Sequence, residues 1–353
     1  MGRAQQRGPV PGPARRPPAA RVRAALSRGG RPHPLPPRVS RRPLPRRVEI
    51  EARAKLNLGL AVGPDRADGY HEIATVYQSI TLADTLVATR IRRGFRLRVR
   101  HEDASVRGHA GRALRAPVPA GESNLVLRAA RKMAERAGIE GGASFRLIKR
   151  IPARAGLGGG SADAAAAVAA MAALYRPRMS LEARRSLCAE IGSDVPFALQ
   201  GGTAIGLGRG ERLQPARLDG PFRVVLAVPR WRVPTAWAYE QISRTKFGLT
   251  GWRAKLRFAQ SLGRKRVSLS RALRLGNTFE GVLGTRREEF RSLCERLRAA
   301  GAVEVRVTGS GSAVFGILAP SVPADQVVGR FAGSEPLFLA RSARAGLKLR
   351  GQS

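Results

Sequence analysis

A glycine-rich run at residues 152–168 is the segment of this chain best suited to chemistry. It reads Pro-Ala-Arg-Ala-Gly-Leu-Gly-Gly-Gly-Ser-Ala-Asp-Ala-Ala-Ala-Ala-Val and separates an apolar run (143–151) from an alanine-rich segment (162–174) that is typical of a helix. Glycine lets backbone N–H groups approach an anion and reaches positive φ at little cost. A glycine loop that opens a helix gathers unpaired N–H groups at the positive end of the helix dipole, which favours phosphate. The alternative is an ordinary turn before a helix capped by Ser161 or Asp163.

A lysine, a carboxylate and a second glycine loop accompany this run. Lys55 and Asn57 alternate with apolar residues, and Asp194 stands two residues before Pro196. Residues 308–312 read Thr-Gly-Ser-Gly-Ser. Taken singly, these features would be solvated strand residues, a helix N-cap and a turn. Together with a phosphate loop they supply charge neutralisation, alignment of a hydroxyl and removal of its proton, which phosphoryl transfer to an alcohol requires.

Two common nucleotide-binding patterns do not fit the glycine run. No Gly-Lys-Ser/Thr follows it as in a P-loop, and it is not the dinucleotide fingerprint. The run resembles the ATP-phosphate loop of the GHMP kinases. The resemblance covers residues 50 to about 345 and rests on these motifs: Ala54-Lys-Leu-Asn-Leu-Gly-Leu60, Asp68-Gly-Tyr-His-Glu72, Glu122-Ser-Asn-Leu125, Gly-Leu-Gly-Gly-Gly-Ser-Ala-Asp-Ala-Ala-Ala from Gly156, Gly192-Ser-Asp-Val-Pro-Phe197, Pro234-Thr235 and Thr308-Gly-Ser-Gly-Ser312. The Asp68–Glu72 motif resembles the one found in the subfamily that acts on a CDP-linked methylerythritol. This motif distinguishes that subfamily from homoserine and mevalonate kinases.

The resemblance implies an α+β fold with two lobes and a site between them. A disordered Arg/Pro-rich tail (1–47) would precede an ATP-binding lobe like domain 2 of ribosomal protein S5 (48–212) and a ferredoxin-like lobe (213–349). The implied activity is transfer of the ATP γ-phosphate, with Mg²⁺, to the 2-hydroxyl of 4-diphosphocytidyl-2-C-methyl-D-erythritol in the non-mevalonate route to isoprenoid precursors. The implied partners are this CDP-methylerythritol and ATP. We expect a cytoplasmic enzyme, monomeric or homodimeric.

Individual roles follow from the same resemblance. Lys55 and Asp194 match the catalytic pair: Asp194 would orient or deprotonate the substrate hydroxyl, and Lys55 would keep that carboxylate ionised. Ser161 matches a position near Mg²⁺. The ATP-binding positions are Asn124, Lys149, Pro152, Gly156, Leu157, Gly158, Gly159, Gly160 and Ser161. The substrate-binding positions are Asn57, Tyr70, His71, Thr235, Tyr239, Gly309, Ser310 and Gly311.

The expected base site consists of two aromatic rings and a histidine. Tyr70 and Tyr239 fall where rings would sandwich cytosine, and His71 where its backbone or its ring would hydrogen-bond the base. Two positions depart from the family pattern. Ala162 stands where a second serine is usual, and Thr278 stands where an aspartate is usual. Neither departure touches the catalytic pair.

The net charge of +39 does not by itself predict a nucleic-acid protein. Residues 1–47 hold thirteen arginines and no acidic residue, and the arginine excess continues over the rest of the chain. Aromatic residues make up only 5% and are scattered, so we expect nonspecific polyanion binding through the tail and no dedicated readout. The tail could be native, an over-extended translation start or a transit peptide. Two other functions are possible for the chain as a whole. It could be another GHMP kinase, or an RNA- or ribosome-associated protein with an S5-like lobe. The second function would not need Lys55 and Asp194 together.

Hydrophobic periodicity predicts the elements that must position these residues. Strict alternation over 48–62 predicts a half-buried strand. Further predicted strands are 73–82, 86–99 (one strand or a hairpin), 222–228, 303–307 and 313–318. Predicted helices are 124–137, 162–174, 181–191, 279–283 and 287–300. Strands and helices mixed without a regular βαβ rhythm indicate an α+β fold. Two distant cysteines indicate a reducing compartment, the histidines form no metal pattern, and no apolar run is long enough to span a membrane.

Overall fold

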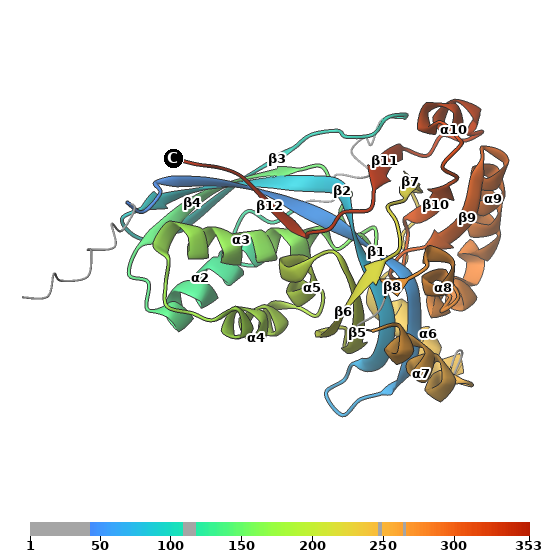
Figure 1. The fold of residues 1–353 in the computed structure, drawn as a ribbon, viewed down its shortest axis with the longest axis horizontal. Helices are drawn as coiled ribbons and strands as arrows, with labels where there is room; N and C mark the ends of the chain where they lie inside the picture. The colour runs from blue at the N-terminus through green and yellow to red at the C-terminus, as the bar shows by residue number, and fades with distance from the viewer. Residues whose placement is uncertain (1–42, 109–117, 246–248, 264–265) are drawn as a thin grey trace, which may run out of the picture. The chain divides into compact units, whose positions relative to one another are not determined.

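Two β-sheets organise the part of the chain that the structure describes, residues 43–108, 118–245, 249–263 and 266–353 of a computed structural model (Figure 1). Most of the predicted tail, residues 1–42, lies outside the described residues. The larger sheet has the order β12-β1-β2-β5-β6-β8, with β4 paired to β2 and β3 to β4, and the smaller sheet has the order β11-β7-β10-β9. The strands are β1 (Arg47–Asp65), β2 (His71–Ile91), β3 (Phe95–His101), β4 (Gly142–Lys149), β5 (Thr203–Gly208), β6 (Arg212–Leu218), β7 (Arg223–Ala227), β8 (Arg266–Val267), β9 (Ala302–Val307), β10 (Val314–Leu318), β11 (Leu337–Arg341) and β12 (Leu347–Gln352). The helices are α2 (Leu125–Ala137), α3 (Gly159–Tyr175), α4 (Leu181–Ile191), α5 (Val195–Gln200), α6 (Thr235–Thr245), α7 (Trp252–Leu262), α8 (Leu269–Leu273), α9 (Arg287–Ala299) and α10 (Ala324–Arg330), with 3₁₀ turns η1 (Thr278–Val282) and η2 (Gly284–Arg286).

The antiparallel pair β1–β2 carries several residues of the predicted site. The strand predicted over 48–62 is confirmed as β1, but a shift of register between Arg53 and Lys55 divides it. The even-numbered residues up to Ala52 pack beneath helices, and those from Ala54 to Leu58 pack in a second core shared with the smaller sheet. Leu60 and Val62 pack in a third core with α6 and η1. Both faces are therefore covered, and the prediction of a half-buried strand is wrong. Lys55 and Asn57, on the face opposite the apolar residues, are 7% and 3% exposed.

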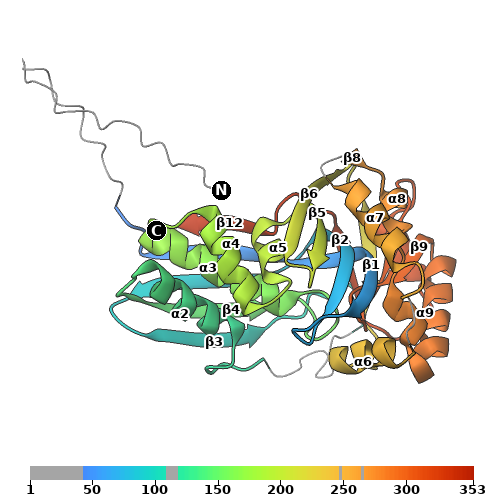
Figure 2. The same ribbon diagram turned by 90° about the horizontal axis from the view of Figure 1, so that it is seen from below.

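Helices α2, α3 and α5 pack against one face of the larger sheet, and α4 packs against these three helices (Figure 2). The predicted alanine-rich helix is confirmed as α3, and its alanines are buried around its circumference because small side chains let it approach both the sheet and α2. This helix begins earlier than predicted, at Gly159, and its N-cap is Gly158. The alternative of a helix capped by Ser161 or Asp163 is therefore wrong. The helix predicted over 181–191 is α4, with Ser180 as its cap.

The smaller sheet forms the last part of the fold together with α9 and α10, which pack against it. Its predicted strands are confirmed as β7, β9 and β10, and the predicted helix over 287–300 as α9. Three strands from this half of the chain, β6, β8 and β12, pair in the larger sheet instead. The lobe boundary at residue 212 stays a prediction, and we propose that the lobes are interwoven, with β12 returning beside β1.

Other predicted bounds differ from the structure. The stretch 73–82 and the beginning of 86–99 are one strand, β2, because no turn interrupts the ladder with β1. Helices α6, which lines the larger cavity, and α7 were not predicted. The short helix predicted at 279–283 is the 3₁₀ turn η1. Within the described ranges, none of the helices combines the length and the apolar character needed to span a bilayer.

Candidate active site

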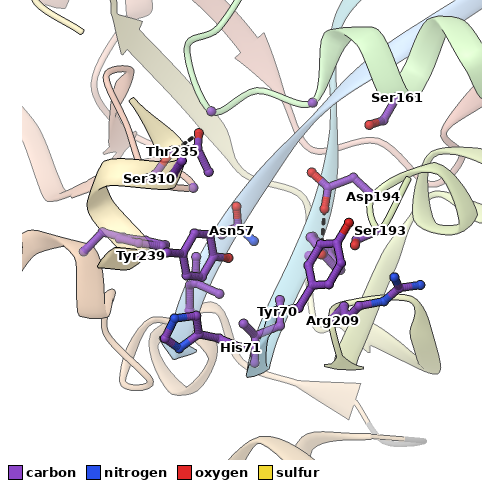
Figure 3. A pocket seen from close by; sticks show the side chains of 18 of the residues that line it. Asn57, Tyr70, His71, Ser161, Ser193, Asp194, Arg209, Thr235, Tyr239 and Ser310 are labelled. Atoms are coloured by element: carbon purple, nitrogen blue, oxygen red, sulfur yellow. Dashed lines mark hydrogen bonds between the residues drawn. The ribbon is translucent and has the colours of Figure 1, made fainter. Parts of the chain in front are cut away.

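Two neighbouring cavities hold the predicted site residues, and the glycine loop lines both. A cavity of about 720 Å³ lies between β1, β2, the start of α5 and the start of α6 (Figure 3). A second cavity of about 390 Å³ lies on the other side of the loop. Both are lined by Gly156, Gly158 and Ser161. This arrangement places a phosphate-binding loop between two spaces that could each hold a small molecule.

The predicted site residues divide between the two cavities largely according to their expected roles. The larger cavity is lined by both predicted catalytic residues and by seven of the eight predicted substrate-binding residues: Asn57, Tyr70, His71, Thr235, Tyr239, Gly309 and Ser310. Gly311 belongs to the second glycine loop but lines neither cavity. The second cavity is lined by all nine predicted ATP-binding residues: Asn124, Lys149, Pro152, Gly156, Leu157, Gly158, Gly159, Gly160 and Ser161.

Lys55 and Asp194 form an ion pair at the wall of the larger cavity. Lys55 Nζ lies 3.5 Å from Asp194 Oδ2 and donates a hydrogen bond to Asn57 Oδ1 at 2.6 Å. Lys55 and Asn57 are two residues apart on β1, so both side chains project from one face. Asp194 precedes α5, yet its side chain makes no capping bond to that helix. The carboxylate instead turns into the cavity, 29% exposed, where a substrate hydroxyl could reach it (Figure 3).

Tyr77, which sequence reasoning did not select, completes the surroundings of this carboxylate. Its hydroxyl donates to Asp194 Oδ1 at 2.8 Å. In the β1–β2 ladder Tyr77 pairs with Asn57, so the two side chains stand on the same face of the sheet. Burial, followed by the charge of Asp194, raises the pKa of Tyr77 well above its ordinary value, so the phenol keeps its proton. No sequence motif marks this position.

The two glycine loops pack directly against each other. Lys55 N–H donates to the Leu157 carbonyl at 3.0 Å, which fixes the first loop to β1. The Thr308 hydroxyl donates to the Gly156 carbonyl at 3.3 Å and accepts the Asn57 N–H at 3.1 Å. Gly158 has φ +69°, and a Cβ there would lie 2.8 Å from Lys55 Cγ. Glycine is therefore required for the loop to pass beside the catalytic lysine.

Aromatic residues form the far end of the larger cavity. Tyr239 stacks on His71 with ring centroids 5.0 Å apart and meets Phe279 edge-on. Tyr70 is 51% exposed, and the Arg209 guanidinium lies 4.8 Å from its ring centroid (Figure 3). Each tyrosine ring thus already contacts another side chain of the protein, and both rings also line the cavity. The polar side of the same cavity includes Thr235, whose hydroxyl lies 3.0 Å from that of Ser310.

Both ring nitrogens of His71 are already engaged within the protein. Nδ1 lies 3.0 Å from the Gly63 carbonyl oxygen, and Nε2 lies 3.1 Å from Asp65 Oδ1 and 3.2 Å from the Ser243 hydroxyl. The ring of His71, one of the two groups expected to bind the base, therefore already has protein partners at both nitrogens.

A buried charged triad forms one wall of the second cavity. Lys149 Nζ lies between the carboxylates of Asp84 and Asp163, 2.6 Å from the latter. Burial is the largest influence on Asp163 and, aided by Asp84 and opposed by Lys149, raises its pKa to about 8. The second oxygen of Asp163 accepts no hydrogen bond among the described residues. Asn124 also lines this cavity, but its amide caps α2 through the Val126 N–H and donates to the Pro119 carbonyl.

The oxygen donors near the loop fit a magnesium ion that arrives with phosphates. Mg²⁺ takes oxygen ligands, keeps several waters and needs only one or two protein donors when phosphates supply the rest. Ser161, in the first turn of α3, and Asp194 both offer such oxygens at the larger cavity. Across the described ranges there is no group of three or more His, Cys, Asp and Glu side chains that could hold a metal without phosphates.

Several residues at the site were missed by sequence reasoning. Besides Tyr77, these are Asp84, Asp163, Ser193 and Arg209. Asp163 lies within the glycine-rich run. A buried lysine requires carboxylate partners, so the burial of Lys149 would have indicated its ion pair with a nearby aspartate such as Asp163. The departures from the family pattern have local roles: the Thr278 hydroxyl accepts the Val62 N–H, and Ala162 is buried inside α3.

Comparison with known proteins agrees with this geometry. The sequence pattern described as the GHMP kinases N terminal domain matches residues 124–202, and the GHMP kinases C terminal pattern matches residues 259–334. The 4-diphosphocytidyl-2-C-methyl-D-erythritol kinase of Pelotomaculum thermopropionicum is 38% identical over 288 residues, 82% of this chain and 95% of that protein. The protein of the same name from Salinispora arenicola is 37% identical over 304 residues, 85% of this chain and 92% of that one.

Solved structures support the same assignment. A crystal structure of 4-(cytidine 5'-diphospho)-2C-methyl-D-erythritol kinase superposes with a TM-score of 0.63 at 33% identity, covering 84% of this chain and 99% of that one. The L. major mevalonate kinase, solved with R-mevalonate, superposes with a TM-score of 0.59 over 83% of this chain and 95% of that one, and at 13% identity it shows a shared fold alone. The chain therefore belongs to the GHMP kinases and, among them, to the 4-diphosphocytidyl-2-C-methyl-D-erythritol kinase family.

Proposed function

We propose that this protein transfers the γ-phosphate of ATP to the 2-hydroxyl of 4-diphosphocytidyl-2-C-methyl-D-erythritol, giving the 2-phosphate and ADP in isoprenoid precursor synthesis. The observation that carries the proposal is the Lys55–Asp194 pair beside a glycine loop that two cavities share. One cavity suits the donor and the other the acceptor. The relatives named 4-diphosphocytidyl-2-C-methyl-D-erythritol kinase match this chain over nearly their whole length, which supports the same pair of substrates.

ATP occupies the second cavity in this proposal. Backbone N–H groups of residues 156–161, at the start of α3, bind its phosphates, because the first N–H groups of a helix have no partner within it. Asn124 and the Lys149 triad lie on the side where the adenine would be. Asp84 and Asp163 hold the Lys149 ammonium in place. The role of Lys149 is therefore to fix the wall of the second cavity against which the adenine lies.

The cytidine end of the acceptor lies between Tyr70 and Tyr239. A flat base stacks well on aromatic faces, and both rings line the larger cavity. Because both ring nitrogens of His71 are engaged, its backbone is the group that we assign to the base. The methylerythritol end then lies toward Asn57, Thr235 and the second glycine loop, beside Asp194.

The chemistry requires a proton acceptor at the acceptor hydroxyl. As the new bond forms between the 2-oxygen and the γ-phosphorus, the bond between that phosphorus and the ADP oxygen breaks, and Asp194 takes the hydroxyl proton. Lys55 stabilises the ionised carboxylate before transfer and the charge on the phosphoryl oxygens during it. Asn57 holds the lysine through its Oδ1, so the ammonium stays beside the loop.

A magnesium ion belongs to the proposal. Bound through the phosphates, with Ser161 as the protein donor, it would neutralise phosphate charge. A cytoplasmic location and a monomeric or homodimeric state are likewise proposed.

The test is a direct assay with the purified chain. Wild-type protein is incubated with ATP, Mg²⁺ and CDP-methylerythritol, and ³¹P NMR follows the products. We expect a new phosphomonoester signal and ADP in equal amounts, with homoserine and mevalonate turned over at least a hundredfold more slowly, on the order of specificity that polar recognition provides. Preferential turnover of either of these alcohols, or no turnover of the CDP compound, would contradict the proposal.

A further inference from the structure

Tyr77 and Lys55 divide the carboxylate of Asp194 between them. The Tyr77 hydroxyl donates to Oδ1 at 2.8 Å, whereas Lys55 Nζ lies 3.5 Å from Oδ2. The lysine also lies 5.9 Å from the centroid of the Tyr77 ring. A single side chain therefore contacts Asp194 through its hydroxyl and Lys55 through its ring.

The surroundings of Tyr77 fix it firmly. The side chain is 1% exposed, and its ring stacks on Phe197 with centroids 4.6 Å apart and an interplanar angle of 22°. Phe197 lies on α5, three residues after Asp194, so this stack joins β2 to the turn that presents the carboxylate.

Two glycines leave the space that this tyrosine occupies. A Cβ on Gly206 would lie 2.4 Å from Tyr77 Cε2, and a Cβ on Gly210 would lie 2.4 Å from the Tyr77 hydroxyl oxygen. Any other residue at either position would displace the ring or its hydroxyl. Strand β5 and the turn that follows it thus accommodate a hydroxylated ring at this place.

We propose that Tyr77 is the positioning residue for Asp194, holding Oδ1 in a fixed hydrogen bond so that Oδ2 remains the oxygen that accepts the substrate proton. The inference rests on the phosphoryl transfer proposed above. A carboxylate free to rotate about its χ2 bond presents its oxygens in many orientations, and a fixed one presents a single oxygen to the hydroxyl.

Tyr77→Phe isolates the hydroxyl, because the ring and its stack on Phe197 remain. We expect kcat to fall by about tenfold, the loss typical for one hydrogen bond to a charged group. The KM values for ATP and for the CDP substrate should stay within about twofold, since Tyr77 lines the larger cavity with a side chain that is only 1% exposed.

Tyr175→Phe is the matched control. Tyr175 lies at the end of α3, lines neither cavity, and donates its hydroxyl to the Gly142 carbonyl at 2.6 Å. This variant also loses one tyrosine hydrogen bond, so a fall in stability is expected without a change in kcat.

A second measurement does not depend on turnover. In protein labelled with ¹³C at aspartate carboxyls, the Asp194 signal is assigned by its loss in Asp194→Asn. We expect its chemical shift to change in Tyr77→Phe, because the carboxylate loses a hydrogen-bond donor, and to stay unchanged in Tyr175→Phe. A Tyr77→Phe protein with wild-type kcat and an unshifted Asp194 carboxyl signal would overturn the inference while leaving the kinase function intact. Absence of turnover by the wild type would instead overturn the proposed function.

Discussion

The α-carbon of Gly156 faces the backbone carbonyl of Thr308 so closely that a Cβ at position 156 would lie 2.1 Å from the carbonyl oxygen. The two glycine loops, far apart in the sequence, therefore meet backbone to backbone. One of them lines the cavity assigned to ATP, and the other lies at the cavity assigned to the acceptor alcohol. Their contact sets how close the two substrates can come.

Gly156→Ala should separate these loops. Gly156 has φ +79°, so alanine is strained there by about 1–3 kcal/mol even before its Cβ meets Thr308. We expect a lower melting temperature and a kcat/KM for ATP reduced by more than about tenfold, since about 1.4 kcal/mol corresponds to that factor. Gly329→Ala on α10, where a Cβ meets nothing within 4 Å, is the control and should change neither quantity in that direction. Equal behaviour of the two variants would show that the loop contact is dispensable.

The buried carboxylate of Asp163 should make stability depend on pH. The pKa of Asp163 is about 8 in the folded protein, against an ordinary value of 3.8. Between pH 3.8 and pH 8, therefore, the folded protein keeps a proton on this carboxyl group that the unfolded chain has released. The stabilisation from this group is complete below about pH 4 and is lost as the pH rises through about 8.

Asp163→Asn removes this dependence and leaves Lys149 paired with Asp84. Relative to wild type, the free energy of unfolding of the variant should rise between pH 5 and pH 8, by up to about 1 kcal/mol per pH unit. Urea unfolding at several pH values measures this difference. Asp325→Asn, at an exposed position of α10, serves as the control. Parallel pH curves for wild type and Asp163→Asn would argue against a proton held at Asp163.

Tyr70→Ala tests the aromatic end of the acceptor cavity. Because this ring is 51% exposed, its removal should leave the melting temperature close to wild type. The KM for the CDP substrate should rise about tenfold to a hundredfold, as expected for loss of about 1–3 kcal/mol of base stacking, with little change in the KM for ATP. Leu349→Ala removes an apolar side chain of similar exposure on β12 and should alter neither KM. Equal effects of Tyr70→Ala on both substrates would place the base elsewhere.

Much of the site could be predicted because its chemistry depends on local sequence. The glycine run, the helix that follows it and the second glycine loop are contiguous motifs, so their residue types carry the information. Lys55 and Asn57 stand on one face by strand periodicity alone. The meeting of Lys55 with Asp194, 139 positions later in the sequence, was predicted from the resemblance and not from the pattern.

The remainder depends on pairings that periodicity does not contain. Tyr77 reaches Asp194 because the β1–β2 register places it opposite Asn57, and that register includes shifts that no alternation reveals. The Lys149 triad joins β2, β4 and α3, so it emerges only when the sheet is assembled. The return of β12 to the edge of β1 is equally a matter of long-range pairing.

The kcat of Asp194→Asn is the measurement that tests the central claim most directly. The carboxylate makes no capping bond to α5, and asparagine preserves its size, so folding and ATP affinity should be retained. Loss of the proton acceptor should lower kcat by about 10²–10⁴-fold in single-turnover experiments with ATP and CDP-methylerythritol. A variant that kept more than about a tenth of the wild-type kcat would contradict the role of Asp194 as general base on that scale.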